Sequence, residues 1–430
     1  MMRDNRLREK FMRTRTLLAC ASGAILLSLA AYAADWPQWR GPQRNGVSAE
    51  TGLLQEWPKD GPRVVWQAKD IGDGYAAPSV VGNRIYILSN RGLDNEFVQA
   101  LSTRDGKQVW STTLGKVGNP EQKPTFPTAR STPTVDGALL YALGSDGDLA
   151  CLKASDGKVQ WKKSLRTDFG GVPGKWAYSE SPLIDGDAVI VTPGGPQATI
   201  VALNKKTGAT IWKSAIPGGD DAAYASAIAV EASGRREYVQ FLAKGLVAVD
   251  AKTGEFLWRY DATGKGNTNI PTPVAGGGYV YTSQGRGPGG LIHLASAQSA
   301  APEQVYLQRG LPNSIGGSVV IGATHFGTTA DGLVAADWAT GKVLWQEAKA
   351  GAGSIVATCN RLYVHTEDGD VILVEASADS YREKGRFTPP DRPKKTRAAM
   401  EKAWAYPAIA NGRLYIRELD SLWAYDIGGK

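Results

Sequence analysis

The residues best suited to ligand chemistry stand just before a series of recurring prolines. They comprise aromatic side chains, an arginine, a glutamate and asparagines: Tyr75, Arg130, Tyr178, Glu180, Tyr224, Asn269, Asn313, Trp404 and Tyr406. Aromatic faces combined with a guanidinium and a carboxylate could hold a planar or anionic small molecule, or a segment of another protein. The alternative interpretation is that these side chains only fill space and satisfy loop backbone. We expect ligand contacts here and assign no catalytic residue.

The other candidates for chemistry are acidic residues and histidines. Asp220 and Asp221, in PGGDDAAYAS, are the nearest candidates for an ion or a base, and Asp221 completes the expected ligand contacts. Two adjacent carboxylates in a glycine-flanked loop are more typical of a solvated turn. His293, His325 and His365 are scattered without the spacing of metal ligands, so we expect no metal site.

These residues belong to a repeat. The phrases STRDGKQVW, ASDGKVQW, NKKTGATIW, DAKTGEFLW and DWATGKVLW end at Trp110, Trp161, Trp212, Trp258 and Trp345. In each phrase a glycine stands four residues before the tryptophan. Such a glycine suits a positive-φ hairpin turn, and the strand that follows carries an aromatic ring that can dock between neighbouring sheets.

A second recurring element lies upstream of each phrase, where a proline is followed eight residues later by an aromatic or aliphatic residue, as from Pro133 to Tyr141. We interpret it as two strands joined by a tight turn, so that one unit is a four-stranded blade of about 40 to 50 residues. Tyr306 and Phe387 replace tryptophan in two weaker units. The last unit ends early, and GPRVVWQAKD, with Trp66, can supply its missing strand. The sequence therefore predicts an all-β propeller of eight four-stranded antiparallel blades, with seven blades as the alternative.

The Gly-Lys-x-x-Trp phrase resembles the tryptophan-docking repeat of quinoprotein dehydrogenases and of the outer-membrane assembly lipoprotein family. The opening DWPQWRGPQRNGVS and the stretch YSESPLIDGDAVIVTPGG further resemble exported bacterial propellers. For an enzyme, the resemblance implies pyrroloquinoline quinone beside Ca²⁺. Many of those dehydrogenases hold the quinone against a ring made by two adjacent cysteines, and no Cys-Cys pair occurs here.

Residues 1–33 are typical of a secretory signal, with a basic start, an apolar run and Ala31-Tyr32-Ala33 as a cleavage site. A lipid anchor at Cys20 is disfavoured because most of the apolar run follows it. Without the leader, 43 basic side chains face 40 acidic ones, which indicates no nucleic-acid surface. We expect a periplasmic or secreted monomer without a membrane span, with residues 34–62 as an N-terminal arm and 63–430 as one propeller domain.

Two functions fit these observations. The favoured one is a binding or scaffold propeller for a protein segment, a polymer or a small ligand, and the alternative is a quinone-dependent dehydrogenase acting on alcohols or sugars. A basic, proline-rich insertion, TPPDRPKKTRAAMEK from Thr388, is either a solvated loop or a contact for an acidic partner.

Overall fold

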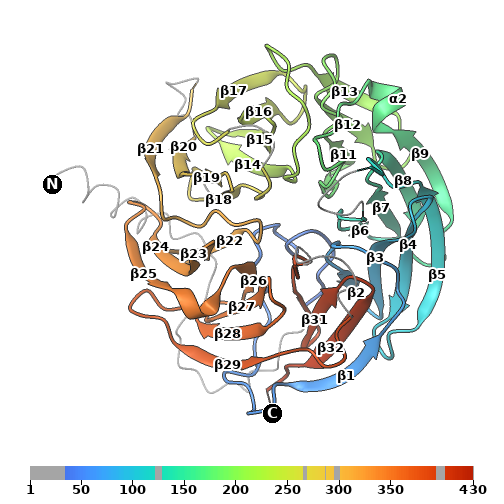
Figure 1. The fold of residues 1–430 in the computed structure, drawn as a ribbon. Helices are drawn as coiled ribbons and strands as arrows, with labels where there is room; N and C mark the ends of the chain where they lie inside the picture. The colour runs from blue at the N-terminus through green and yellow to red at the C-terminus, as the bar shows by residue number, and fades with distance from the viewer. Residues whose placement is uncertain are drawn as a thin grey trace.

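The computed structural model describes residues 34–121, 128–264, 269–285, 287–294, 301–393 and 402–429. The signal segment with Cys20, and Lys394, Lys395 and Arg397 of the insertion, lie outside the described residues. Eight four-stranded antiparallel sheets stand around a central axis, which confirms the predicted propeller and its blade number (Figure 1). The helical elements within these ranges are α2 (Leu165–Phe169) and the 3₁₀ turn η1 (Ala348–Ala350).

The blades follow one another along the chain, each from its innermost to its outermost strand. Blade 1 contains β2 (Ser79–Val81), β3 (Arg84–Arg91), β4 (Asn95–Ser102) and β5 (Gln108–Gly115). Blade 2 contains β6 (Thr134–Asp136), β7 (Leu139–Leu143), β8 (Asp148–Lys153) and β9 (Val159–Ser164). Blade 3 contains β10 (Leu183–Asp185), β11 (Ala188–Val191), β12 (Ile200–Asn204) and β13 (Thr210–Ser214). Blade 4 contains β14 (Ile228–Ala232), β15 (Arg235–Phe241), β16 (Leu246–Asp250) and β17 (Phe256–Tyr260).

The second half repeats this pattern. Blade 5 contains β18 (Val274–Gly276), β19 (Tyr279–Ser283), β20 (Gly289–His293) and β21 (Glu303–Gln308). Blade 6 contains β22 (Ser318–Ile321), β23 (Thr324–Thr329), β24 (Gly332–Asp337) and β25 (Val343–Glu347). Blade 7 contains β26 (Gly353–Ala357), β27 (Arg361–Thr366), β28 (Val371–Glu375) and β29 (Glu383–Phe387). Blade 8 contains β30 (Ala408–Ala410), β31 (Arg413–Glu418), β32 (Ser421–Asp426) and, as its outermost strand, β1 (Arg63–Ala68).

The ring closes where the two ends of the chain meet. Strand β1 pairs antiparallel with β32, so GPRVVWQAKD does complete the last blade. Arg417 of β31 then reaches blade 1, where it donates hydrogen bonds to the carbonyls of Gly72, Ala76 and Leu88. This guanidinium is fully buried, and the desolvation lowers the pKa of Arg417 to about 9. Two features therefore close the ring. Strands β1 and β32 pair at the outer edge of blade 8, and the buried Arg417 bonds blade 8 to blade 1 nearer the axis.

The repeated glycine and tryptophan meet across blade boundaries. Gly157 has φ +74°, and a Cβ on it would lie 2.5 Å from the ring of Trp110 in the preceding blade. Trp110 Nε1 also donates to the carbonyl of Ala154 at 3.1 Å. The rings of Trp66, Trp161 and Trp212 make the same contacts with the next blade.

Trp345 donates to Ser377 of the next blade, whereas Trp258 donates to Glu237 within its own blade. Cys151 pairs directly opposite Trp161, at the position that Ala100 holds opposite Trp110, which agrees with its interpretation as a small buried residue. Apolar clusters fill the space between adjacent blades; one, for example, joins Tyr141 and Leu143 of blade 2 to Val189 and Val201 of blade 3. The aromatic docking thus sets the spacing of the loops that enter the innermost strands.

Candidate functional site

The predicted ligand contacts lie in the loops that enter the innermost strands β2, β6, β10, β14, β18, β22 and β30. We call the end of the channel where these loops gather the mouth. The structure brings together two aromatic pairs there. The rings of Tyr75 and Trp404 are 5.3 Å apart, and those of Trp176 and Tyr224 are 5.4 Å apart. Tyr75, Trp176 and Trp404 are half-buried, so their rings keep contact with solvent.

Arg130 stands between these two pairs. Its Nη1 donates to the carbonyl of Trp176 at 3.0 Å. Burial lowers the pKa of Arg130, and the nearby Tyr75, Glu96 and Tyr224 oppose that shift. The side chain is half-buried. The mouth therefore places aromatic faces beside a guanidinium that is bonded to a backbone carbonyl, and Trp176 was not among the predicted residues.

Six predicted contacts lie outside this group, and Glu180 and Tyr406 are two of them. The Tyr178 hydroxyl donates to the carbonyl of Pro193 within a buried apolar cluster. Asn269 donates to the carbonyls of Leu242 and Ala243, and Asn313 donates to the carbonyl of Gly287. Asp221 is exposed. These contacts indicate that Tyr178, Asn269 and Asn313 hold loops in place.

Glu180 is a buried carboxylate just behind the mouth. It accepts hydrogen bonds from the Thr192 amide and, at 3.1 Å, from Gln240 Nε2. Burial raises its pKa to about 7. Glu96 is a second carboxylate of this kind, since burial raises its pKa to about 7 while the amide and hydroxyl of Ser145 donate to it. Both carboxylates brace loops that lead toward the mouth.

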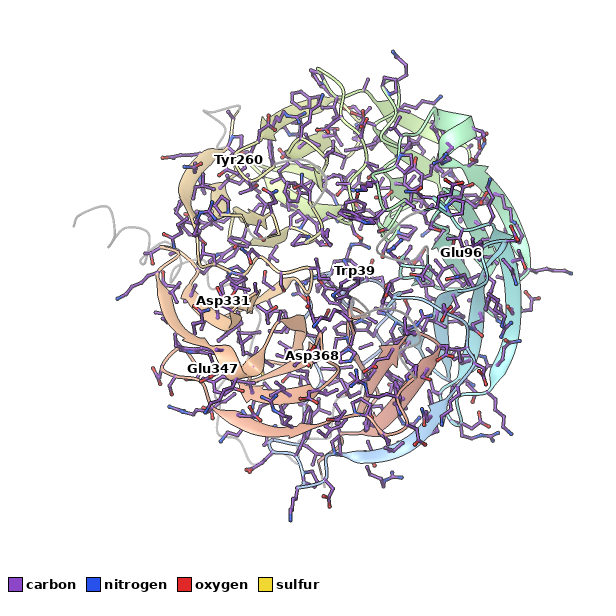
Figure 2. The ribbon with its side chains drawn as sticks, in the orientation of Figure 1. Trp39, Glu96, Tyr260, Asp331, Glu347 and Asp368 are labelled. Carbon is purple, nitrogen blue, oxygen red and sulfur yellow. The ribbon has the colours of Figure 1, made fainter. Side chains whose placement is uncertain are left out.

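The N-terminal arm enters the central channel, which the sequence did not predict. Trp39 donates from Nε1 to Thr272 at 2.9 Å, and its ring lies 4.5 Å from that of Tyr406. Figure 2 shows Trp39 close to the centre of the ring, whereas Tyr260 and Glu347 lie at its periphery. The ring of Tyr406, a predicted ligand contact, therefore already packs against Trp39 of the same chain.

Two buried arginines anchor the arm. Arg40 donates to the carbonyl of Ser318, and Arg44 donates to the carbonyls of Ser181 and Pro182. Burial lowers the pKa of Arg44 to about 9, and the nearby Glu180 opposes that shift. The signal for this role lies in DWPQWRGPQRNGVS, where tryptophan and arginine recur in a segment without strand periodicity. Such side chains need partners elsewhere in the fold.

A small hollow opens beside one aromatic pair. Tyr75, Trp404, Lys402 and Glu418 line it, together with Pro393, Ala403, Ala405, Arg417 and Leu419. Glu418 pairs with Arg392 of the insertion at 2.8 Å. The first described part of the insertion therefore packs on the ring instead of extending into solvent.

The described residues do not fit a calcium-bound quinone. Asp220 and Asp221 are the acids proposed for such chemistry. Asp221 is exposed, and the Asp220 carboxylate accepts from Arg259 at 2.6 Å and from the Lys244 amide at 2.9 Å. Within the described ranges, no cluster of three or more histidine, cysteine, aspartate or glutamate side chains forms a metal site. A hard cation such as Ca²⁺ needs several oxygen ligands at one point. We derive no step through this cofactor.

The fold and the docked aromatic repeat define an eight-bladed propeller of the tryptophan-docking class. Residues 94–347, more than half of the chain, match the model of a family described as outer membrane protein assembly factor BamB. The chain belongs to that family.

Individual relatives are more distant. The chain is 32% identical over 176 residues to the assembly factor BamB of Burkholderia pseudomallei, covering 39% of this chain and 42% of that protein. It is 25% identical over 228 residues to a tetrathionate hydrolase of Acidithiobacillus ferrooxidans, covering 50% of this chain and 40% of that protein. The chain thus spans less than half the length of these curated relatives.

Solved structures support the fold. BamB from Moraxella catarrhalis has a TM-score of 0.59 at 17% identity, covering 85% of this chain and 97% of that chain. A quinohemoprotein alcohol dehydrogenase from Comamonas testosteroni has a TM-score of 0.64 at 14% identity, covering 92% and 81%. At these identities the likeness concerns the fold alone.

Proposed function

We propose that this protein is an exported binding module whose channel mouth holds a segment of another protein. The observation that carries the proposal is the two aromatic pairs near Arg130, in which Tyr75, Trp404 and Trp176 are half-buried and Tyr224 is buried. Aromatic residues and arginine are enriched where proteins bind one another, because they bury large areas and keep a polar group for orientation. Membership of a family named for protein assembly supports a protein ligand.

Export is part of the proposal. The basic start, apolar run and Ala31-Tyr32-Ala33 of the leader support cleavage after Ala33. In the described ranges, the helices are too short to cross a membrane. Mass spectrometry of the protein recovered from the periplasm or medium should give Ala34 as its first residue. Recovery of the uncleaved chain from the cytoplasm would contradict export.

Photocrosslinking tests the binding role. A photoreactive phenylalanine analogue is placed at Tyr224 or Trp176 in the mouth, and at Ile211, which is 50% exposed on outer strand β13, as the control. We expect a discrete crosslinked protein from the mouth positions in living cells and none from Ile211. Equal crosslinking at all three positions, or none in the mouth, would remove the proposal.

The quinone alternative is tested separately. Purified protein is mixed with pyrroloquinoline quinone and Ca²⁺ and assayed for a shifted absorption band and for dye reduction with alcohols and sugars. We expect neither, because Asp220 is already bonded to Arg259. Saturable binding of the quinone together with dye reduction would show that the protein is a dehydrogenase, and it would contradict the proposed binding role.

A further inference from the structure

The N-terminal arm joins opposite walls of the central channel. In a ring of eight blades, blade 1 faces blade 5, blade 2 faces blade 6 and blade 3 faces blade 7. Trp36 exchanges two backbone hydrogen bonds, both at 2.8 Å, with Val80 of β2 in blade 1. Trp39 Nε1 donates to Thr272 Oγ1 in the loop that enters blade 5. The arm therefore spans the channel from blade 1 to blade 5.

The arm spans the channel in two further directions. Its hydrogen bonds to blades 2, 6, 3 and 7 are, in that order, the Val135 amide to the Pro37 carbonyl, Arg40 to the Ser318 carbonyl, Arg44 to the Pro182 carbonyl, and the Ala357 amide to the Gly46 carbonyl. Each partner belongs to an innermost strand or to the loop that enters it. Because residues 36–46 bond to opposite walls in each direction, they close the channel below the mouth.

This segment begins and ends at the far end of the channel, opposite the mouth. Asp35 Oδ1 accepts from the Gly82 amide in the turn between β2 and β3, and Glu50 Oε2 accepts from the Gly412 amide in the turn between β30 and β31, both at 2.8 Å. These turns follow innermost strands, whereas the mouth loops precede them. Trp39 bonds a mouth loop instead. The arm therefore rises from the far end to the mouth at Trp39 and returns.

Trp39 is the residue of this segment that lies beneath the aromatic pairs of the mouth. It is half-buried, whereas Trp36 is only 1% exposed. Its ring lies 4.5 Å from that of Tyr406, two positions after Trp404 of the mouth, and Figure 2 shows it close to the centre of the ring of blades. Its indole N–H is already bonded to Thr272, so the ring offers an incoming ligand an apolar face.

The charges of the same segment disfavour a basic side chain at this point. Arg40 and Arg44 are buried cations, and Glu180 is the carboxylate whose charge acts on Arg44. Burial raises the pKa of Glu180 to about 7, so this carboxylate is only partly ionised at neutral pH. A basic side chain on Trp39 would therefore meet a net positive charge. An apolar side chain would remove its own surface and that of the indole from water without this repulsion.

We infer that the arm closes the base of the mouth and that Trp39 is a contact residue of the bound protein segment. The segment enters as a loop or as a chain end, and it turns back or stops at Trp39, where it packs an apolar side chain on the indole ring. It does not thread through the channel. The inference rests on the proposed binding role of the mouth and adds the form of the segment that the mouth accepts.

Photocrosslinking in living cells tests this inference with the full chain. The photoreactive phenylalanine analogue is placed at Trp39 and, as the control, at Ala49, which is exposed on the arm at the far end; Tyr224 is the reference in the mouth. We expect the same crosslinked protein from Trp39 and Tyr224 and none from Ala49. Mass spectrometry of the product from Trp39 should locate the reacted residue in a turn or at a terminus of the partner.

The other outcomes separate the inference from the proposed function. Capture of the partner at Ala49 as well would mean that the segment passes through the channel, which overturns the inference. Capture at Tyr224 without capture at Trp39 would leave the binding module standing and remove only the contact with Trp39. Capture at neither position would remove both.

Matched variants test the indole face itself, with the analogue kept at Tyr224. Trp39→Ala should lower the crosslinking yield at least fivefold, whereas Trp39→Phe, which keeps an aromatic face but loses the donor to Thr272, should change it less than twofold. Circular dichroism melts establish that each variant is folded. If Trp39→Ala does not fold, Trp39→Gln replaces it, because an amide can still donate to Thr272 while the apolar face is lost. An unchanged yield in the folded variant would also overturn the inference.

Discussion

The backbone N–H of Ala34 donates a hydrogen bond to Glu50 Oε1 at 3.1 Å. The same carboxylate accepts from the amides of Asn411 and Gly412, in the turn between β30 and β31, and is only 3% exposed. Burial raises the pKa of Glu50, and the backbone donors oppose that shift. Glu50 therefore joins the start of the arm to the last blade. Cleavage after Ala33 would turn the Ala34 nitrogen into an ammonium and this hydrogen bond into an ion pair.

The first prediction concerns that ion pair. In protein that begins at Ala34, Glu50→Gln should lower the free energy of unfolding by about 1–3 kcal/mol. A form with extra residues before Ala34 has an amide there, and the same change should cost it less. A free α-amino group has a pKa of about 7.7–8.0, and pairing raises it in the folded protein. The added stability should therefore be complete below about pH 7.7 and disappear as the pH rises through the folded pKa. Urea unfolding of the form that begins at Ala34 and of the extended form, each with and without Glu50→Gln, measures the loss of stability. Identical losses in the two forms would contradict the ion pair.

The second prediction concerns Glu96 and Glu180, whose pKa burial raises to about 7. The folded protein then holds more protons than the unfolded chain between about pH 4.5 and 7. Stability should fall as the pH rises through that window, by up to about 3 kcal/mol for each carboxylate. The double variant Glu96→Gln and Glu180→Gln should flatten the profile, and Glu303→Gln, on exposed β21, should not. A double variant that keeps the wild-type slope would show that other groups cause it.

The third prediction isolates the aromatic docking. Gly157→Ala places a methyl group 2.5 Å from the Trp110 ring at φ +74°. Gly137→Ala has a similar backbone strain, at φ +57°, but nothing lies within 4 Å of the new carbon. We expect Gly157→Ala to cost about 1–3 kcal/mol more than Gly137→Ala because it forces two blades apart. Thermal melts of the two variants give the difference, and equal Tm values would mean that the indole moves at no cost.

The fourth prediction concerns ring closure. Arg417→Met leaves the carbonyls of Ala76 and Leu88 without their donors, and each such group costs about 1–3 kcal/mol. Arg63→Met removes a pair with Asp426 that also belongs to blade 8, but its side chain is 70% exposed. That loss should stay below about 1 kcal/mol. Chemical denaturation of the two variants gives the loss of unfolding free energy for each. Similar losses would show that the hydrogen bonds of Arg417 add no stability.

The repeat made the fold predictable. A glycine four residues before each tryptophan predicts a hairpin, and the structure pairs Trp110 with Ala100 and Trp161 with Cys151 in equivalent registers. Blade number followed from counting aromatic anchors and from the missing strand of the last unit, which Arg63–Ala68 supplies. A phrase that recurs in five units, with aromatic substitutes in two more, is recognised easily because each copy strengthens the same signal.

The site was less predictable because its neighbours are not sequence neighbours. Tyr75 and Trp404 were both predicted at the mouth, but their contact and the hollow beside them depend on how blade 8 closes on blade 1. Tyr178 and Tyr224 both lie in loops that enter innermost strands, β10 and β14, and yet Tyr178 bonds Pro193 in the loop between β11 and β12. Trp39 and Arg40 carry no repeat at all, so only their side-chain types hinted at a buried role.

The joining of β1 to β32 also governs the order of folding. These strands stand at opposite ends of the chain, with Arg63 and Asp426 separated by 363 positions. Strand β1 is synthesised first, and its partner is synthesised last, so β1 must wait unpaired while the other blades form. Pairing over such a separation is slow because the entropy cost of closing the intervening chain comes before any contact between the two strands can offset it. We therefore expect the pairing of β1 with β32 to be a late step of folding, and an unpaired strand edge to be exposed to aggregation until it occurs.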